Sequence, residues 1–140
     1  MAIVYFDSSA FVKLVVDEDG SDVAAMLWDG CDAAVSSRLA YPEVRAALAA
    51  AGRSGRLTPA DQRRAEAAWE EYWAACRPVE LTGSMTGHAG DLAGRHGLRG
   101  ADAVHLASLL AVSADAVFAV WDIRLRQAAR SVGVKAVPAG

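Results

Sequence analysis

Short apolar runs alternate along this chain with longer segments in which apolar residues recur every three or four positions. The first run, residues 2–6, is rich in β-branched and aromatic side chains and stops at Asp7, a pattern typical of a buried strand. The recurrence at three and four residues predicts helices between the runs. The predicted strands are residues 2–6, 33–36, 78–82, 116–121 and 135–137, and the predicted helices lie within residues 8–16, 21–28, 38–52, 59–75, 83–96, 101–114 and 124–132.

Residues that favour helix ends mark several of these boundaries. Ser8 and Ser9 are the predicted N-caps of the first helix, because their hydroxyl groups can accept hydrogen bonds from free backbone N–H groups. Thr58 is a second predicted N-cap, followed by Pro59 at the first helical position. Pro42 indicates that the helix ending near residue 52 either starts close to this proline or is kinked by it.

The alternation of strands and helices predicts the fold class. Helical connections of this length join parallel strands, so we expect a three-layer α/β/α sandwich with a mainly parallel sheet of four to five strands. In such sheets, ligands bind beyond the carboxyl ends of the strands. Polar residues that directly follow strands are therefore the first candidates for a functional site.

Composition and charge narrow the class of protein. The chain has 140 residues, 54% hydrophobic and 22% charged, which suits one ordered domain over residues 1–140 and excludes intrinsic disorder. The net charge of −3 does not indicate a general nucleic-acid coat protein. Cys31 and Cys76 are expected to be reduced thiols. No apolar stretch approaches the roughly 20 residues of a membrane helix, and no basic leader precedes Asp7, so we expect a cytoplasmic protein.

Four acidic residues stand where this fold would place its site. Asp7 ends the first strand, Asp122 follows the fourth, and Glu43 and Asp102 open helices. An acid in a first helical turn also has a purely structural role, because it stabilises the helix dipole by about 0.3–1 kcal/mol. Carboxylates within about 4 Å of each other repel by roughly 1–4 kcal/mol per pair, and a divalent cation relieves that repulsion. An all-oxygen set favours Mg²⁺ or Mn²⁺, which can activate water for phosphodiester hydrolysis.

Four segments together resemble a known family. YFDSSAFVKL at residues 5–14, YPEVRAAL at 41–48, GADAVHLA at 100–107 and WDIRLRQAARSVG at 121–133 are similar, in order and spacing, to PIN-domain ribonucleases of the VapC toxin type. The resemblance implies a PIN-like domain in which Asp7, Glu43, Asp102 and Asp122 bind Mg²⁺ or Mn²⁺ and cleave RNA, such as tRNA or rRNA. It further implies a homodimer, a VapB-type antitoxin as partner, and contact with DNA only through that antitoxin.

One position departs from the family pattern. Many relatives have a hydroxyl residue two positions before the last acid, where this chain has Val120, followed by Trp121. A hydrogen bond to Asp122 would then be missing. The alternative function is therefore a catalytically weakened domain that binds RNA or an antitoxin. A phosphatase or receiver domain is disfavoured, because Asp7 has no second Asp two residues on.

Other conspicuous residues have structural interpretations as well as functional ones. His105 lies on the helical face of Asp102, and we expect it to be a packed, hydrogen-bonded core residue and not a ligand. The aromatic residues of the long helix are expected to pack and not to stack on bases. Arg126 and Arg130 either contact RNA or pair locally. The remaining residues of interest are Trp69, Tyr72 and Trp73 on that helix, the basic set Arg53, Arg56, Arg63 and Arg64, and Phe11, Val12, Leu14 and Val15, which could form a partner groove.

Overall fold

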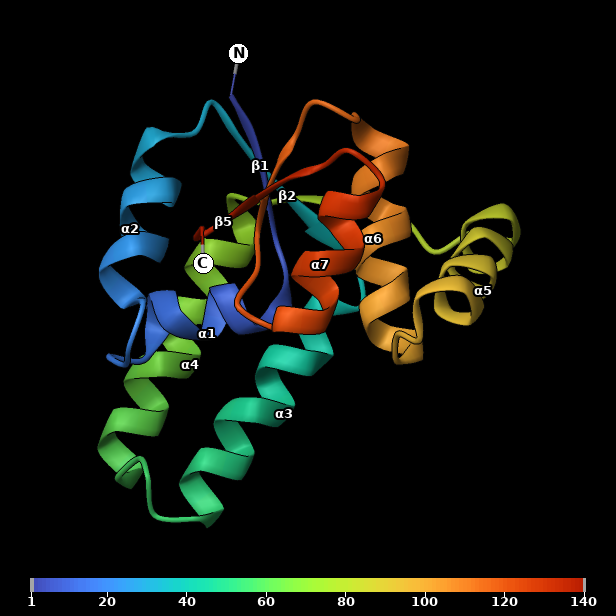
Figure 1. Ribbon diagram of the computed structural model, residues 1–140. Coiled ribbons are helices and arrows are strands. Elements are labelled where there is room, and N and C mark those ends of the chain that lie inside the picture. The colour runs from blue at the N-terminus through green and yellow to red at the C-terminus, as the bar shows by residue number, and fades with distance from the viewer. Residues whose placement is uncertain (1, 140) are drawn as a thin grey trace.

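The computed structural model describes residues 2–139 and has the predicted alternation of strands and helices (Figure 1). Each predicted strand and helix has a counterpart, with ends that differ by a few residues. The strands are β1 (Ile3–Phe6), β2 (Ala33–Ser37), β3 (Arg77–Val79), β4 (Val117–Ala119) and β5 (Lys135–Val137). The helices are α1 (Ser8–Val15), α2 (Ser21–Gly30), α3 (Ala40–Arg53), α4 (Pro59–Ala74), α5 (Gly83–His96), α6 (Gly100–Val112) and α7 (Ile123–Ser131).

The five strands form one sheet in the order β3-β2-β1-β4-β5, and each neighbouring pair is parallel. Tyr5 of β1 aligns with Val35 of β2 on one side and with Phe118 of β4 on the other. This confirms the predicted fold class. Because β1 is the central strand, the residue that follows it, Asp7, lies in the middle of the carboxyl edge of the sheet.

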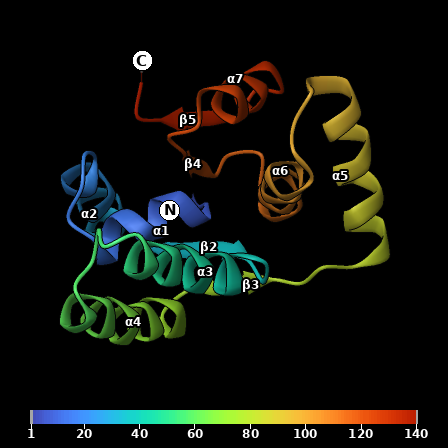
Figure 2. The same cartoon turned by 90° about the horizontal axis from the view of Figure 1, so that it is seen from below.

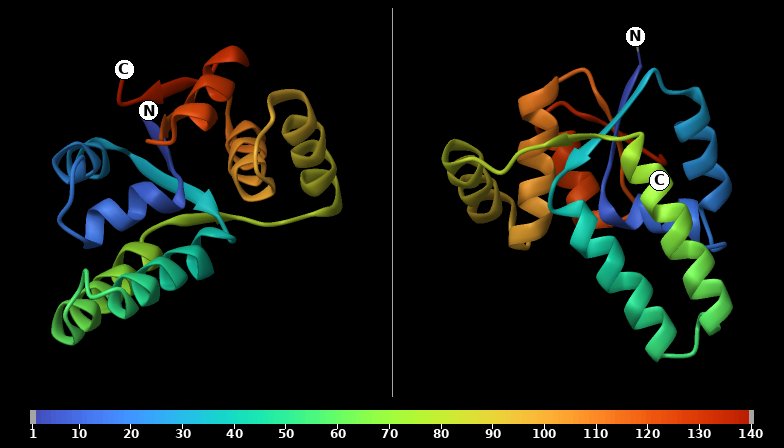
Figure 3. Two further views of the ribbon diagram at one scale, coloured as in Figure 1. Left: turned by 60° about the horizontal axis from the view of Figure 1, so that its bottom comes forward. Right: turned by 180° about the vertical axis from the view of Figure 1, so that it is seen from behind.

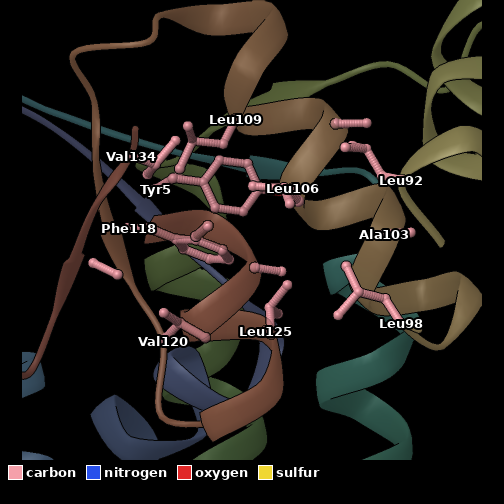
Figure 4. Packing of buried hydrophobic residues seen from close by; sticks show 14 of the residues in the cluster. Tyr5, Leu92, Leu98, Ala103, Leu106, Leu109, Phe118, Val120, Leu125 and Val134 are labelled. Carbon is pink, nitrogen blue, oxygen red and sulfur yellow. The ribbon is translucent and has the colours of Figure 1, made fainter. Parts of the chain in front are cut away.

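Helices cover both faces of the sheet and make two cores (Figure 2). Side chains of a strand alternate between faces, so Tyr5 belongs to one core while Val4 and Phe6 belong to the other. The Tyr5 core contains residues of α5, α6 and α7, with Leu106 and Phe118 fully buried (Figure 4). The opposite core contains residues of α1, α3 and α4. The carboxyl edge of the sheet lies between these two layers of helices.

Two helices extend beyond the sheet as a hairpin. Figure 3 shows α3 and α4 running side by side past the strands, joined at their far ends by residues 54–58. Trp69 of α4 is fully buried, and its ring centroid lies 4.8 Å from that of Phe11 on α1. Tyr72 and Trp73 are half-buried and pack against the same core. The packing interpretation of these aromatic residues is confirmed.

Two local predictions were wrong and one was resolved. The N-cap of α1 is Asp7, whose carboxylate accepts from Ala10 N–H at 2.9 Å, whereas Ser8 and Ser9 are the first helical residues. Strand β4 ends at Ala119, two residues before the predicted end, although Val120 N–H still donates to Val137 O of β5. Pro42 falls in the first turn of α3, where no intrahelical N–H bond is needed, so the helix starts there without a kink. No helix within residues 2–139 is long and apolar enough to cross a membrane.

Candidate active site

The four predicted acids lie at the carboxyl edge of the sheet. Asp7 directly follows β1, Asp122 caps α7 after β4, and Glu43 and Asp102 lie in the first turns of α3 and α6. Asp102 is close enough for its charge to raise the pKa of Asp7. Arg99 interacts electrostatically with Asp102, Asp122 and Glu43. Residues far apart in sequence therefore form one acidic cluster with Arg99 beside it.

Asp7 is the most buried of the four acids. Only 5% of its surface is exposed, and burial raises the pKa of its carboxyl group, although His105 and hydrogen bonds from Ala10 and Ser9 act in the opposite direction. Both hydrogen bonds fall on Oδ1, from Ser9 Oγ at 2.8 Å and from Ala10 N–H at 2.9 Å. A carboxylate in this position is destabilised as an anion, so it favours any cation that can reach it.

Glu43 is held by two side chains. Its Oε1 accepts hydrogen bonds from Ser8 Oγ and from His105 Nε2, the latter at 2.7 Å. Burial raises the pKa of Glu43, but the hydrogen bond and charge of His105 together with the Ser8 hydroxyl outweigh it and leave the pKa below its usual value. Glu43 is therefore fixed as a carboxylate, with one oxygen committed to the protein.

Tyr5 and His105 form a buried hydrogen-bond relay that leads to Glu43. His105 is 2% exposed, and its Nδ1 lies 2.8 Å from the Tyr5 hydroxyl oxygen, which also accepts from Ser37 N–H at 3.0 Å. Burial raises the pKa of Tyr5 far above its usual value, so this hydroxyl keeps its proton and can donate it to Nδ1. The other ring nitrogen, Nε2, carries a proton and donates it in the hydrogen bond to Glu43. His105 is a packed, hydrogen-bonded residue, as predicted, and it also orients an acid of the site.

Asp102 and Asp122 form the outer part of the cluster. Asp102 Oδ2 accepts from Arg99 Nε at 2.8 Å, and that hydrogen bond with its ion pair raises the pKa of Arg99. Asp122 is exposed, and its Oδ1 accepts from Leu125 N–H at 2.9 Å as the N-cap of α7. Arg99, Asp102 and Asp122 line a pocket of about 560 Å³ together with Trp121, Ile123 and Arg124. This pocket opens the acidic cluster to solvent.

The donor set fits a hard divalent cation. In all four acids, the hydrogen bonds supplied by residues 2–139 fall on one oxygen, which leaves the second carboxylate oxygen without a protein donor. Carboxylate oxygens with no competing thiolate are the ligands that Mg²⁺ and Mn²⁺ prefer. As they stand, no three Asp, Glu, His or Cys side chains within residues 2–139 are grouped closely enough to hold an ion. Glu43 is drawn toward His105 and Asp102 toward Arg99, so the side chains have to turn to share a ligand.

Two contributors to the site were missed from the sequence. Arg99 reads as an ordinary loop arginine, and Tyr5 as a core aromatic. The signal for Arg99 was its spacing of three residues from Asp102, which favours an ion pair on one helical turn. Tyr5 carries no such signal, because its partner His105 is distant in sequence.

Arg126 and Arg130 have partners outside the acidic cluster, and Val120 lies in the core. Arg126 donates to Pro138 O at 3.0 Å, and Arg130 donates to Ala136 O at 3.1 Å, so both tie the C-terminal strand to α7 instead of facing RNA. An ion pair of Arg126 with Asp122, the acid four residues before it, is not among the ion pairs of residues 2–139. Val120 is fully buried and packs with Leu125 in the Tyr5 core (Figure 4). It offers Asp122 no hydrogen bond.

Comparison with known proteins points to one family. Residues 4–130 match the PIN domain family. The chain is 61% identical over 140 residues to Ribonuclease VapC45 and to Ribonuclease VapC49, both from Mycobacterium tuberculosis, with 99% of this chain and 97% of each relative covered. It is 34% identical over 138 residues to Ribonuclease VapC46 of the same species, with 98% of both chains covered.

Proposed function

The chain belongs to the PIN domain family, and from that premise we propose that it is a divalent-metal-dependent endoribonuclease toxin neutralised by a VapB-type antitoxin. In this proposal residues 1–140 are a single PIN-like domain. Asp7, Glu43, Asp102 and Asp122 bind Mg²⁺ or Mn²⁺. The observation that carries the proposal is the set of four acids at one sheet edge, each with one oxygen free of protein donors.

The chemistry follows from the way the chain holds these groups. A bound divalent ion would supply a Lewis acid and a lowered pKa for coordinated water. Buried Asp7 provides the anion that is least solvated and gains most from a cation. His105 and Ser8 hold Oε1 of Glu43, and Oε2 has no protein donor within residues 2–139 and would be the oxygen offered to the ion. Hydrolysis by water breaks the P–O3′ bond and leaves a 5′-phosphate and a 3′-hydroxyl group.

Analysis of product ends tests this function. The purified chain is incubated with RNA and Mn²⁺ or Mg²⁺, and the fragments are probed for their termini. We expect 5′-phosphate and 3′-hydroxyl ends. Cyclic-phosphate ends would show attack by the ribose 2′-hydroxyl and contradict the proposed mechanism. RNA binding without cleavage would favour the alternative of a weakened binding domain, for which the missing hydroxyl at Val120 is the specific structural argument.

Replacing His105 is expected to weaken the site without removing a ligand. His105→Ala releases Glu43, and the loss of an outer partner of this kind typically costs about 10–100-fold in activity or metal affinity. His105→Gln retains an N–H donor and should recover part of that loss. The measurements are kcat for RNA cleavage and its dependence on Mn²⁺ concentration, with the unfolding temperature measured alongside. Equal loss in the alanine and glutamine variants would contradict the positioning role.

A groove between α1, α3 and α4 is the surface that we propose for the antitoxin. The groove has a volume of about 1030 Å³ and an apolar part that includes Val12 and Val15 of α1, Ala47 of α3, Leu57, and Ala68 of α4. Charged side chains also line it: Asp17, Glu18, Arg56, Asp61, Arg64 and Glu71. Phe11, which the sequence also offered for a groove, is fully buried and belongs to the core instead. Asp7 is the N-cap of α1, and Glu43 lies one turn before Ala47 on α3. A peptide in this groove would therefore lie beside the acidic cluster. We place the antitoxin segment there, and the homodimer implied by the family remains part of the proposal.

A charge placed in this groove is expected to separate inhibition from catalysis. Ala47→Glu introduces a carboxylate into the apolar part of the groove, and a bound peptide would have to desolvate it, so inhibition by the co-purified cognate antitoxin should weaken by at least about tenfold. Cleavage by the free toxin should be unchanged. Ala46→Glu, exposed on the same helix but outside the groove, is the matched control. Unaltered inhibition of Ala47→Glu would place the antitoxin elsewhere.

A further inference from the structure

The pocket beside Asp102 and Asp122 has a composition that the acidic cluster does not explain. Besides these two acids it is lined by two arginines, Arg99 and Arg124, and by two apolar residues, Trp121 and Ile123. Its volume of about 560 Å³ lies within the roughly 300–1,000 Å³ typical of small-ligand sites. A metal ion and its water need neither an indole ring nor a second arginine.

We propose that this pocket holds one unpaired nucleotide of the RNA substrate, with its base against Trp121 and its phosphate on Arg99 and Arg124. The inference rests on the proposed ribonuclease function and assigns Trp121, Arg99 and Arg124 to the binding of one nucleotide of its substrate. Three observations carry it: the free donors of the arginines, the fixed orientation of the indole, and the exposed apolar side chain next to it.

Both arginines have donors to spare. Arg99 is 76% exposed and uses Nε for Asp102, and no residue in 2–139 accepts from its terminal nitrogens. Arg124 is exposed, and Nη1 makes one long contact of 3.4 Å to Gly97 O. A phosphate approaching four carboxylates is repelled unless cations stand at the entrance. Guanidinium groups match phosphate oxygens with two parallel hydrogen bonds, so this pair can both attract and orient the backbone.

Trp121 is held in one position by its neighbours. Lys13 Nζ lies 5.2 Å from the ring centroid, and Lys13 is itself fixed by Glu18 at 2.9 Å. Gly20, with φ of +91°, lies so close that an added Cβ would be 2.7 Å from Trp121 Nε1. The buried part of the indole packs against the core, while its accessible part lines the pocket. Because Lys13 lies over one face of the ring, the part of the indole that lines the pocket is the surface offered to a base, and a ring held in this way loses little entropy when a base binds.

Ile123 completes the apolar side of the pocket. It is 63% exposed at the first position of α7, where it makes no contribution to either core. A base that stacks on protein side chains must first be unstacked from its neighbours, which favours loops and single strands over duplexes. The pocket therefore selects an unpaired nucleotide next to the bond that is cleaved.

RNA binding in an inactive background tests the inference. In Asp7→Asn with Mg²⁺, the affinity for a labelled single-stranded RNA oligonucleotide should exceed that for its duplex. Adding Trp121→Ala should weaken single-strand binding by about 5-fold to 150-fold, the equivalent of about 1–3 kcal/mol for one stacked base. Trp121→Phe should keep most of the affinity while losing the quenching of tryptophan fluorescence by RNA. Arg124→Ala should weaken binding, whereas Arg63→Ala, on the exposed face of α4, should not.

The outcomes separate this inference from the proposed function. If the wild-type chain cleaves RNA but Trp121→Ala and Arg124→Ala leave single-strand affinity and KM unchanged, the pocket assignment is wrong and the ribonuclease stands. Equal affinity for single strand and duplex, or quenching that persists in Trp121→Phe, would likewise overturn it. If the wild type neither binds nor cleaves RNA, both proposals fail. Should Trp121→Ala not fold, the phenylalanine variant and Arg124→Ala carry the test.

Discussion

Chelation of divalent cations with EDTA is expected to abolish RNA cleavage, with a loss of at least about a thousandfold, equivalent to about 4 kcal/mol of transition-state stabilisation. The physical reason is the acidic cluster itself. The cluster supplies oxygen ligands for an ion. The buried His105 beside it is hydrogen-bonded to Tyr5 and Glu43, so it is not free to act as a base that activates water without an ion. Cleavage should return on adding Mn²⁺ or Mg²⁺ in excess of EDTA, and gel analysis of a labelled RNA measures both steps.

The same experiment has a second readout in protein stability. A ligand at about 100 times its dissociation constant stabilises the folded state by about 2.7 kcal/mol, so Mn²⁺ should raise the unfolding temperature. Cleavage that persists undiminished in EDTA would contradict the metal mechanism. An unfolding temperature that Mn²⁺ does not alter would show that the four acids do not share an ion.

Protonation should counteract metal binding at Asp7. Burial raises the pKa of its carboxyl group above the usual 3.8, so the folded chain holds this proton more tightly than the unfolded chain does. In metal-free protein, the contribution of Asp7 to stability is then largest below pH 3.8 and is lost as the pH rises through the elevated pKa. Protons and Mn²⁺ compete for the same oxygens, so the metal-induced rise in unfolding temperature should shrink as the pH is lowered from neutral.

Asp7→Asn is expected to eliminate activity while sparing or improving the fold. Loss of a ligand carboxylate in the centre of the cluster should reduce kcat by about a thousandfold, or about 4 kcal/mol. Asparagine caps helices as well as aspartate does, so the hydrogen bond to Ala10 N–H survives. Because a buried, repelled charge is removed, the unfolding temperature of the metal-free variant at neutral pH should be higher than that of the wild type.

A matched control makes the result specific. Asp22→Asn changes an exposed acid in the first turn of α2, outside the acidic cluster, and should leave both cleavage and the response to Mn²⁺ intact. In Asp7→Asn the gain in unfolding temperature on adding Mn²⁺ should disappear. Near-wild-type cleavage by Asp7→Asn would contradict its assignment to the metal centre.

The fold was predictable because its signals are local. The apolar run that ends at Asp7 defines β1, and the Thr58–Pro59 pair marks the start of α4, where the structure places it. The N-cap of α1 was assigned wrongly because Asp, Ser and Ser follow one another, and all three side chains can accept a backbone N–H. In the structure the two serine hydroxyls instead donate hydrogen bonds to carboxylates, Ser8 to Glu43 and Ser9 to Asp7.

The position of the four acids was predictable in part, and their contacts were not. Asp7, Asp122 and Glu43 stand at a strand end or in the helix that follows a strand, which in a parallel sheet brings them to one edge, whereas Asp102 opens α6, which follows α5 and not a strand. The Tyr5–His105–Glu43 relay joins residues 100 and 62 positions apart, a relation that periodicity does not encode. The attraction of Asp102 to Arg99 likewise depends on side-chain geometry that a sequence pattern leaves open.

Arg126 and Arg130 of α7 bind the exposed edge of the sheet at β5. Strand β5 is the last in the order, and Val137 O accepts from Val120 N–H, so the carbonyls of Ala136 and Pro138 face outward. Arg130 donates to both of these oxygens, and Arg126 donates to the second. Unsatisfied border groups are a template on which another chain can add a strand and seed aggregates. Here Arg126 and Arg130 occupy these two carbonyls from within the same chain, which disfavours the addition of another chain's strand along β5.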